Sequence, residues 1–385
     1  MNIMDQSLQL HNKLKGKIEI TNKYEINTKL DLALVYTPGV ASSCMKINES
    51  PEESYNLTTK GNTVAVISDG TAVLGLGDIG PLAAMPVMEG KCALFKRFAG
   101  IDAIPIVLNT KDTDEIVQTI YNIAPSFGGI NLEDISAPRC FEVERRLKEM
   151  LDIPVFHDDQ HGTAIVSCAA LLNALKLVKK DIKDVKIVVN GAGSAGVAIT
   201  TFLMQLGAVN VLVCDRFGIM DEADERLNSS QRKLASITNP NQIKGDLKEA
   251  LINAEVFIGV SAGNVVSQDM VRLMAQNPIV FALANPTPEI SREDALLAGA
   301  FVYGAGVSNQ PNQINNALVF PGLFKGALKA RVKQITTEME IAACYALSGI
   351  IPETELKNDY VIPDIFNELV SKSISEAIIR IQENL

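Results

Sequence analysis

The sequence lacks tryptophan, contains only three histidines and has no excess of basic residues. Its 35 lysines and arginines are outnumbered by 45 aspartates and glutamates, which gives a formal net charge of −10 at pH 7. A chain of this charge matches a phosphate backbone poorly, so we expect no nucleic acid as its main partner. A small anionic substrate is still compatible with it, because a few cations in a cleft outweigh the global charge locally.

No two cysteines have the C-x-x-C spacing. The six cysteines are Cys44, Cys92, Cys140, Cys168, Cys214 and Cys344. Their irregular spacing fits small buried side chains in a reducing compartment better than a disulfide framework. The first residues, MNIMDQSLQLHNK, contain no apolar segment of the kind that a signal peptide needs. We therefore expect a cytoplasmic protein.

No membrane partner is expected either, although Ile187–Cys214 contains no charged residue. The same stretch holds Asn190, Gln205, Asn210 and four glycines, which the interior of a bilayer disfavours. A strand, a turn, a helix and a second strand explain this stretch better.

The length of 385 residues predicts two domains, because one hydrophobic core seldom serves so long a chain. A composition of 47% hydrophobic and 21% charged residues excludes a disordered chain. From Thr63 onward, apolar stretches alternate with helical patterns, which favours an α/β fold with largely parallel sheets. The expected strands are 63–67, 103–108, 129–132, 153–157, 185–190, 209–215, 256–260, 279–284 and 301–303.

A polar break at Lys179–Asp184 lies between two such alternating regions. We predict one α/β domain over residues 1–160 for substrate and metal, and a Rossmann-type, doubly wound domain over 161–385. An apolar helix over 163–178 is expected to connect them. Helical patterns dominate the region after Pro321, so the chain is expected to end in helices.

The dinucleotide fingerprint G-x-G-x-x-G occurs twice, at Gly75–Gly80 and at Gly191–Gly196. Only the second copy follows an apolar strand and begins a helix. The strand after that helix ends at an acid, Asp215. Glycines there let backbone amides reach a pyrophosphate, and the aspartate can accept both ribose hydroxyls. The first copy places Asp78 where it would repel a pyrophosphate, so we interpret it as a tight turn that leads into a helix.

Asp215 also predicts the choice of dinucleotide. A carboxylate beside the adenine ribose repels the 2′-phosphate of NADP and so favours NAD. Arg216 weakens this preference because a guanidinium can pair with a phosphate, but Asp221 and Glu222 add negative charge nearby. NAD is the expected cofactor, with NADP as the alternative.

Two acid pairs follow predicted strands: Glu133 with Asp134, and Asp158 with Asp159. Carboxyl ends of parallel strands face the ligand crevice, and two acid pairs there repel each other unless a cation lies between them or one acid is protonated. Hard carboxylate oxygens suit Mg²⁺ or Mn²⁺. Each pair taken alone fits a helix cap equally well.

Other polar residues in this region support less specific hypotheses. His157 and His161 have a spacing that zinc sites use, but no third nitrogen or sulfur ligand is nearby, so we expect structural roles for both. Lys91 lies among apolar residues. Near a divalent cation, a buried lysine would have a lowered pKa and could act as a general base, whereas a solvent-exposed helix face is the simpler interpretation.

Together these stretches resemble the malic enzymes, specifically the short bacterial type. The segments that carry the resemblance are YTPGV at Tyr36, SDGTAVLGLG at Ser68, MEGKCALF at Met88, NLEDI at Asn131, FHDDQHGTA at Phe156, the Gly191 fingerprint, ANPTPE at Ala284 and NNALVFPG at Asn315. They occur in the family's order, and YTPGV combined with HDDQHGTA is highly specific.

The resemblance implies oxidative decarboxylation of malate to pyruvate and CO₂ with reduction of a nicotinamide cofactor. It implies Tyr36 as the general acid and Lys91 as the general base, with Asp158 beside Lys91. The other implied contacts are Glu133, Asp134 and Asp159 for Mg²⁺ or Mn²⁺; Gly191, Gly193, Ser194, Ala195, Gly196, Asp215 and Asn285 for the cofactor; and Lys91, Asn285 and Asn316 for the substrate. A homodimer or homotetramer is also implied.

One departure from the family pattern concerns the substrate carboxylate. Larger family members carry an arginine soon after the Asp-Gly pair, where Thr71 and Ala72 stand here, so the group that holds this carboxylate is not identified. No phosphotransacetylase-like domain is expected after Leu385. Two alternatives stay open: a malolactic enzyme, which releases lactate, and a non-catalytic nicotinamide-sensing module. An amino-acid dehydrogenase would leave Glu133 and Asp159 without a role.

Overall fold

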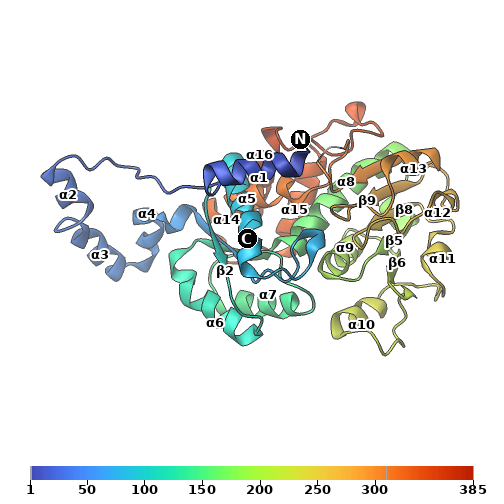
Figure 1. Ribbon diagram of the computed structural model, residues 1–385, viewed down its shortest axis with the longest axis horizontal. Coiled ribbons are helices and arrows are strands. Elements are labelled where there is room, and N and C mark those ends of the chain that lie inside the picture. Colours follow the sequence, from blue (N-terminus) through green and yellow to red (C-terminus); the bar gives the residue numbers. More distant parts are fainter. Residues whose placement is uncertain (1, 309, 385) are drawn as a thin grey trace.

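The computed structural model describes residues 2–308 and 310–384, and two sheets flanked by helices form its body (Figure 1). The first sheet is fully parallel and has the order β2-β1-β3-β4. Its strands are β1 (Thr63–Ser68), β2 (Asp102–Val107), β3 (Gly129–Leu132) and β4 (Val155–His157). The crossover helices are α5 (Pro81–Ala99), α6 (Thr113–Ile123) and α7 (Arg139–Met150).

The second sheet has the order β10-β9-β8-β5-β6-β7, and only the short β7 runs antiparallel to its neighbour. The strands are β5 (Lys186–Asn190), β6 (Asn210–Asp215), β7 (Gly218–Ile219), β8 (Val256–Gly259), β9 (Ile279–Ala282) and β10 (Val302–Ala305). The chain starts in the middle, builds β6 and β7 on one side, and then builds β8 to β10 on the other. This order confirms the predicted doubly wound fold and places the topological switch point at β5.

The second sheet is surrounded by helices that connect its strands and by helices that precede or follow it in the sequence. The connecting helices are α9 (Ser194–Gln205), α10 (Ser229–Ala235), α11 (Leu247–Leu251), α12 (Gln268–Arg272) and α13 (Arg292–Leu297). The long helix α8 (Thr163–Val178) leads into the sheet, and α14 (Phe320–Lys329), α15 (Thr337–Ser348) and α16 (Leu369–Glu383) follow it. The expected helical C-terminal region is therefore confirmed.

One buried apolar cluster joins both sheets. It contains Val64 from β1, Phe95 from α5, Ile187 from β5 and Phe324 from α14. The rings of Phe95 and Phe320 lie 4.6 Å apart, so the C-terminal helices pack against the first sheet as well as following the second. A domain boundary near residue 160 separates the two sheets in sequence, and it stays a prediction.

Helix α8 occupies the centre of this cluster. With the turn before it, it forms the one stretch among the described residues, Asp158–Val178, that is long and apolar enough to cross a membrane, but 67% of that stretch is buried inside the fold. Its apolar character is explained by helices and sheets packed around it.

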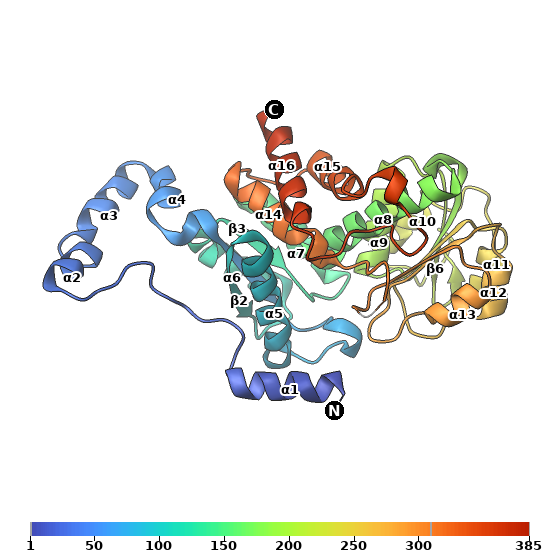
Figure 2. The same cartoon turned by 90° about the horizontal axis from the view of Figure 1, so that it is seen from above.

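The N-terminal segment extends away from this body. It comprises α1 (Ile3–Leu14), α2 (Lys29–Val35), α3 (Val40–Glu49) and α4 (Ser54–Leu57). Figures 1 and 2 both show α2 and α3 on an arm that projects beyond the first sheet. Neither helix has a buried residue. We refer to residues 20–50 as the arm.

Candidate active site

Four carboxylates meet at the carboxyl end of the first sheet. Glu133 and Asp134 follow β3, and Asp158 and Asp159 follow β4, which is the neighbouring strand. Asp134 adopts a φ of 55°, an uncommon conformation for an L-residue, and its backbone N–H donates to Asp159 Oδ2 at 2.7 Å. One oxygen each from Glu133, Asp134 and Asp159 lies within 4.8 Å of the others.

Lys91 reaches this acid cluster from α5. Its Nζ lies 2.8 Å from Glu133 Oε1 and forms an ion pair with Asp158 Oδ2, while the ring of Phe320 lies 4.3 Å away. Only 7% of Lys91 is exposed. Burial lowers the pKa of Lys91, but Asp158, Glu133 and Asp159 together outweigh it and raise that pKa above its usual value. The carboxylates therefore hold the proton on the amine, and the lowered pKa expected beside a divalent cation stays a prediction.

The same burial acts on the carboxyl groups in the opposite sense. It raises the pKa of Asp134 to about 9, that of Glu133 and Asp158 to about 7, and that of Asp159 to about 6, with mutual repulsion adding to the shift for Asp134. One lysine cannot balance this many acids. The cluster is therefore deficient in positive charge.

A divalent cation fits this deficit. Asp134 Oδ2 is buried and has no hydrogen-bond partner in the described part of the chain. Asn131 Nδ2 donates to Glu133 Oε2 at 3.0 Å, which orients that carboxylate from outside the cluster. Three close carboxylate oxygens of this kind are a donor set that Mg²⁺ and Mn²⁺ prefer.

Asp158 and Asn316 lie together beside the turn that follows β4. Residues Asp158–Gly162 form a π-helical turn, a feature frequent at functional sites, before α8 begins. A Cβ on Gly162 would lie 1.9 Å from Asp158 Oδ1 and 3.2 Å from the Asn316 Cβ, so only glycine fits there. Asn316, in the short helix Asn316–Leu318, is thereby placed beside Asp158, at the edge of the acid cluster.

Asn285 lies where the two sheets face each other. Its backbone oxygen packs against Gly75 from the first sheet's loop, and its Nδ2 packs against Gly306, which follows β10. The Gly75–Gly80 copy of the fingerprint thus forms a turn that leads into α5, as predicted, and it contacts the second sheet. Asn285 is exposed, so its amide is available to a ligand in this crevice.

The Gly191 fingerprint lies at the switch point of the second sheet. Gly191 has a φ of 120°, and Gly196 packs against the Gly191 oxygen so closely that no side chain fits. At Gly193, no atom of the described chain lies within 4 Å of the position that a Cβ would take, which leaves space for a phosphate group of a ligand. Ser194 and Ala195 begin α9, whose N-terminus has no side-chain cap. Asp215 ends β6, and its Oδ1 accepts from the Phe217 N–H at 2.7 Å.

Tyr36 is the one predicted catalytic residue that the described part of the chain does not bring to the acid cluster. It ends α2 on the arm, and 64% of it is exposed. Figures 1 and 2 both place α2 far from α5, which carries Lys91. Within one chain, the general acid implied by the resemblance is separated from the general base.

The sequence analysis expected a structural role for His161 but missed three buried acids that support the site, namely Glu144, Glu340 and Glu289. His161 is held between Glu144 Oε1 at 2.8 Å and Glu340 Oε1 at 2.9 Å, which links α7 to α15. Burial lowers the pKa of His161, but these two carboxylates outweigh it and raise that pKa to about 10. In the second sheet, Glu289 accepts from the backbone N–H of Ser261 and Ala284 at 2.8 and 3.1 Å. Its place in ANPTPE was the only signal for it.

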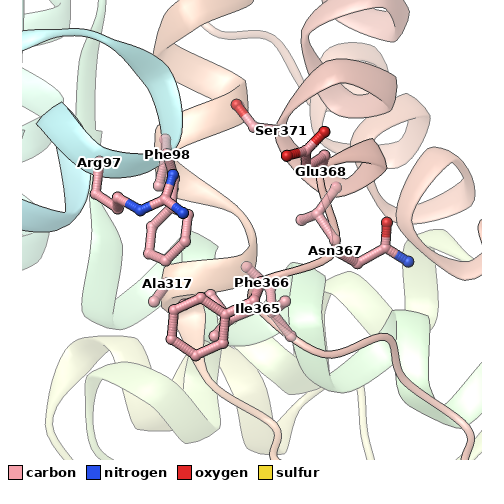
Figure 3. Close-up of a pocket in the computed structure, with 12 residues that line it drawn as sticks. Arg97, Phe98, Ala317, Ile365, Phe366, Asn367, Glu368 and Ser371 are labelled. Atoms are coloured by element: carbon pink, nitrogen blue, oxygen red, sulfur yellow. The ribbon is translucent and has the colours of Figure 1, made fainter.

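A separate pocket lies beneath the short helix that contains Asn316. Figure 3 shows Arg97 and Phe98 of α5 on one side of it, and Glu368 and Ser371 near the start of α16 on the other. Its volume is about 180 Å³. None of the predicted site residues lines it, so it is distinct from the acid cluster.

Comparisons with known proteins agree with this geometry. Residues 15–148 match the family model for the malic enzyme N-terminal domain, and residues 160–382 match that for the malic enzyme NAD binding domain. An NAD-dependent malic enzyme of Geobacillus stearothermophilus is 53% identical over 98% of this chain and 79% of its own length. A bifunctional malic/malolactic enzyme of Bacillus subtilis is 50% identical over 98% of this chain and 92% of its own.

A solved structure supports the same assignment. The NAD-dependent malic enzyme of Thermotoga maritima superposes with a TM-score of 0.94 at 48% identity, covering 97% of this chain and 98% of that one. Both domain models and the full-length relatives match, and the two-sheet architecture is shared. The chain therefore belongs to the malic enzyme family, whose members are decarboxylating oxidoreductases.

Proposed function

We propose that this protein catalyses the divalent-metal-dependent oxidative decarboxylation of malate to pyruvate and CO₂, with NAD as the preferred oxidant. The observation that carries the proposal is the buried contact of Lys91 with Glu133 and Asp158, beside a group of three carboxylates that lacks positive charge. A helix cap or a solvated lysine would need neither this burial nor this convergence.

Lys91 is the proposed general base. The carboxylates around it raise its pKa, and burial alone lowers it. Once Glu133, Asp134 and Asp159 hold a divalent cation, they attract the lysine proton less strongly, and burial then favours the neutral amine. Lys91 is then able to accept the proton of the C2 hydroxyl while hydride leaves C2 for the nicotinamide.

Glu133, Asp134 and Asp159 would hold Mg²⁺ or Mn²⁺, and the ion would supply a Lewis acid for the oxygens of the substrate. Asn285, beside Gly75 and Gly306, and Asn316, beside Asp158, would contact the substrate and the nicotinamide. Breakage of the bond to the departing carboxylate leaves its electron pair on the enol form of pyruvate. Tyr36 donates the proton that C3 then needs.

The exposed arm offers a way for Tyr36 to reach the acid cluster of a second chain. Leu30, Leu32, Leu34 and Tyr36 are all more than half exposed on one short helix, an apolar surface that a single chain leaves uncovered. We infer that the protein is a homodimer in which this arm packs on the partner and places Tyr36 at the partner's acid cluster. The six cysteines are free and five are buried, which fits a cytoplasmic enzyme.

Formation of NADH by the purified protein with malate and Mn²⁺ tests the proposal. We expect reduction of NAD that excess EDTA abolishes and that added Mn²⁺ restores. Absence of malate-dependent reduction with either NAD or NADP would contradict it, and activity that survives EDTA would contradict the metal site.

The malolactic reaction is the second candidate, because one relative is named a bifunctional malic/malolactic enzyme. Both reactions use the same base, acid and carboxylates, and they differ in whether pyruvate leaves before it is reduced. Quantifying pyruvate and lactate in the same assay separates them. We expect pyruvate in amounts equal to the NADH formed.

A further inference from the structure

The loop that follows Asp215 carries two arginines on one aromatic ring. The guanidinium carbon of Arg226 lies 3.9 Å from the centre of the Phe217 ring, and that of Arg216 lies 4.7 Å from it. Phe217 is half exposed, and its backbone N–H donates to Asp215 Oδ1. Both cations therefore lie next to the carboxylate that marks the adenine-ribose end of the fingerprint.

The Nε–Nη2 edge of the Arg226 guanidinium is already engaged by an acid. Its Nε donates to Asp224 Oδ1 at 2.8 Å and its Nη2 donates to Asp224 Oδ2 at 2.6 Å, a bidentate pair. The backbone N–H of Arg226 donates to the same carboxylate at 2.9 Å. Hydrogen bonds from Arg226 hold the pKa of Asp224 at about 2, so this partner is ionised at neutral pH.

Two other charged groups of the loop, Asp221 and Arg232, have partners elsewhere. Asp221 pairs with Lys244 at 3.4 Å, and the Arg232 guanidinium donates to the carbonyl oxygens of Glu222 and Leu227. Asp224 is thus the acid that occupies the Nε–Nη2 edge of Arg226 and balances its charge. An arginine with a free edge beside the ribose is the usual partner of a 2′-phosphate.

We propose that Asp224 is a specificity-determining residue, which excludes NADP by occupying the guanidinium of Arg226, the group that would otherwise bind the 2′-phosphate. The inference rests on the proposed dinucleotide site at Gly191. It assigns to Asp224 a role distinct from that of Asp215, because Asp215 repels the phosphate directly, whereas Asp224 acts through Arg226. Asp224 is a positioning residue in this sense.

Binding of two nucleotides tests the proposal without turnover. The probes are AMP and adenosine 2′,5′-bisphosphate, titrated calorimetrically into wild type and into Asp224→Asn, which keeps an Oδ1 acceptor and removes the charge. We expect affinity for the bisphosphate to rise about tenfold in Asp224→Asn, with affinity for AMP unchanged, because one charge-assisted pair becomes available.

Two further variants separate the proposal from other causes. Asp221→Asn removes an equal charge from the same loop and should leave both affinities unchanged. In the double variant Asp224→Asn/Arg226→Ala, the gain should disappear. An equal gain in Asp221→Asn, or a gain that survives loss of Arg226, overturns the proposal. Binding of neither AMP nor NAD to wild type would instead overturn the proposed dinucleotide site, and this proposal with it.

Discussion

At the scale of single residues, Lys91 and Tyr36 differ in burial, and their proposed roles as base and acid can be tested separately. Lys91 is buried between acids, whereas Tyr36 is mostly exposed on the arm. Lys91→Ala removes the proposed base for hydride transfer, so both malate oxidation and oxaloacetate reduction should fall by about 10²–10⁴. Tyr36→Phe removes only a proton donor to C3, so oxaloacetate reduction, which needs no such proton, should keep most of its rate.

The comparison is made by following NADH consumption with oxaloacetate and NADH formation with malate for both variants. We expect Lys91→Ala to be defective in both assays and Tyr36→Phe to be defective only with malate. If Tyr36→Phe loses oxaloacetate reduction as completely as Lys91→Ala does, the assigned division between acid and base is wrong.

Asp215 carries a second prediction at this scale. Its carboxylate ends β6 and Oδ1 accepts from the Phe217 N–H, while Oδ2 has no hydrogen-bond partner among the described residues. Asp215→Ser removes a like charge from beside the 2′-phosphate and should shift the ratio of kcat/KM for NADP over NAD upward by about tenfold or more. Steady-state kinetics with both cofactors measure it. A wild-type preference for NADP, or no shift in the variant, would show that Asp215 does not face the ribose.

The residues of the candidate site were predictable where they directly follow a predicted strand. Asp134 and Asp159 end neighbouring strands, so strand order alone brings them together. Glu144 and Glu340 were not predictable, because their partner His161 lies on another element and no local pattern joins them. The sequence also does not show how many acids surround the Lys91 amine, because Glu133, Asp158 and Asp159 reach it from two strand ends that only the fold brings together.

At the scale of elements, Glu144 ties α7 to the turn that follows β4. It is buried and pairs with Lys148 at 2.8 Å and with His161. We expect Glu144→Gln to lower the free energy of unfolding at pH 7.5 by about 3 kcal/mol, because it removes one of the two carboxylates that hold His161 and the acid that pairs with Lys148. Glu142→Gln on the same helix is the control, because its side chain is 54% exposed and should contribute little.

The pH dependence of this difference follows from the direction of the pKa shift. The positive groups around Glu144 outweigh its burial and hold its pKa well below the ordinary value of 4.5. The unfolded chain therefore binds a proton at a higher pH than the folded one, and the stabilisation is complete above pH 4.5 and lost as the pH falls below it. Denaturant titrations of wild type and Glu144→Gln should converge at acid pH. A difference that is constant with pH would contradict the ion pair as its cause.

Element types and positions in the body were predictable because the hydrophobic period changes clearly between strands and helices. The expected strand at 129–132 and helix at 163–178 match β3 and α8 residue for residue. Strand ends elsewhere differ by one or two residues, since hydrogen bonding to a neighbouring strand decides where pairing stops. The arm could not be predicted, because its apolar residues suggest burial that a single chain does not provide.

At the scale of the whole molecule, the two sheets share one core that no local pattern indicates. Phe95 of α5 contacts Phe320 and Phe324, which follow it in the chain only after the entire second sheet. Phe320 in turn lies against the Lys91 amine. Helix α14 therefore packs against the helix that carries Lys91 and supports one side of the acid cluster. Its position depends on packing between segments that are distant in sequence, and no sequence motif indicates it.

The proposed homodimer predicts a specific pattern of complementation, because each site would combine Lys91 from one chain with Tyr36 from the other. A mixed dimer of a Tyr36→Phe chain and a Lys91→Ala chain contains one site with both defects and one site with neither. Such dimers, isolated by two different affinity tags after co-expression, should recover about half of wild-type malate oxidation, although each parent homodimer is nearly inactive. If Tyr36 instead acts within its own chain, every site keeps one defect and no activity returns. The measured quantity is NADH formation per mixed dimer, with wild-type chains carrying the same two tags as the reference.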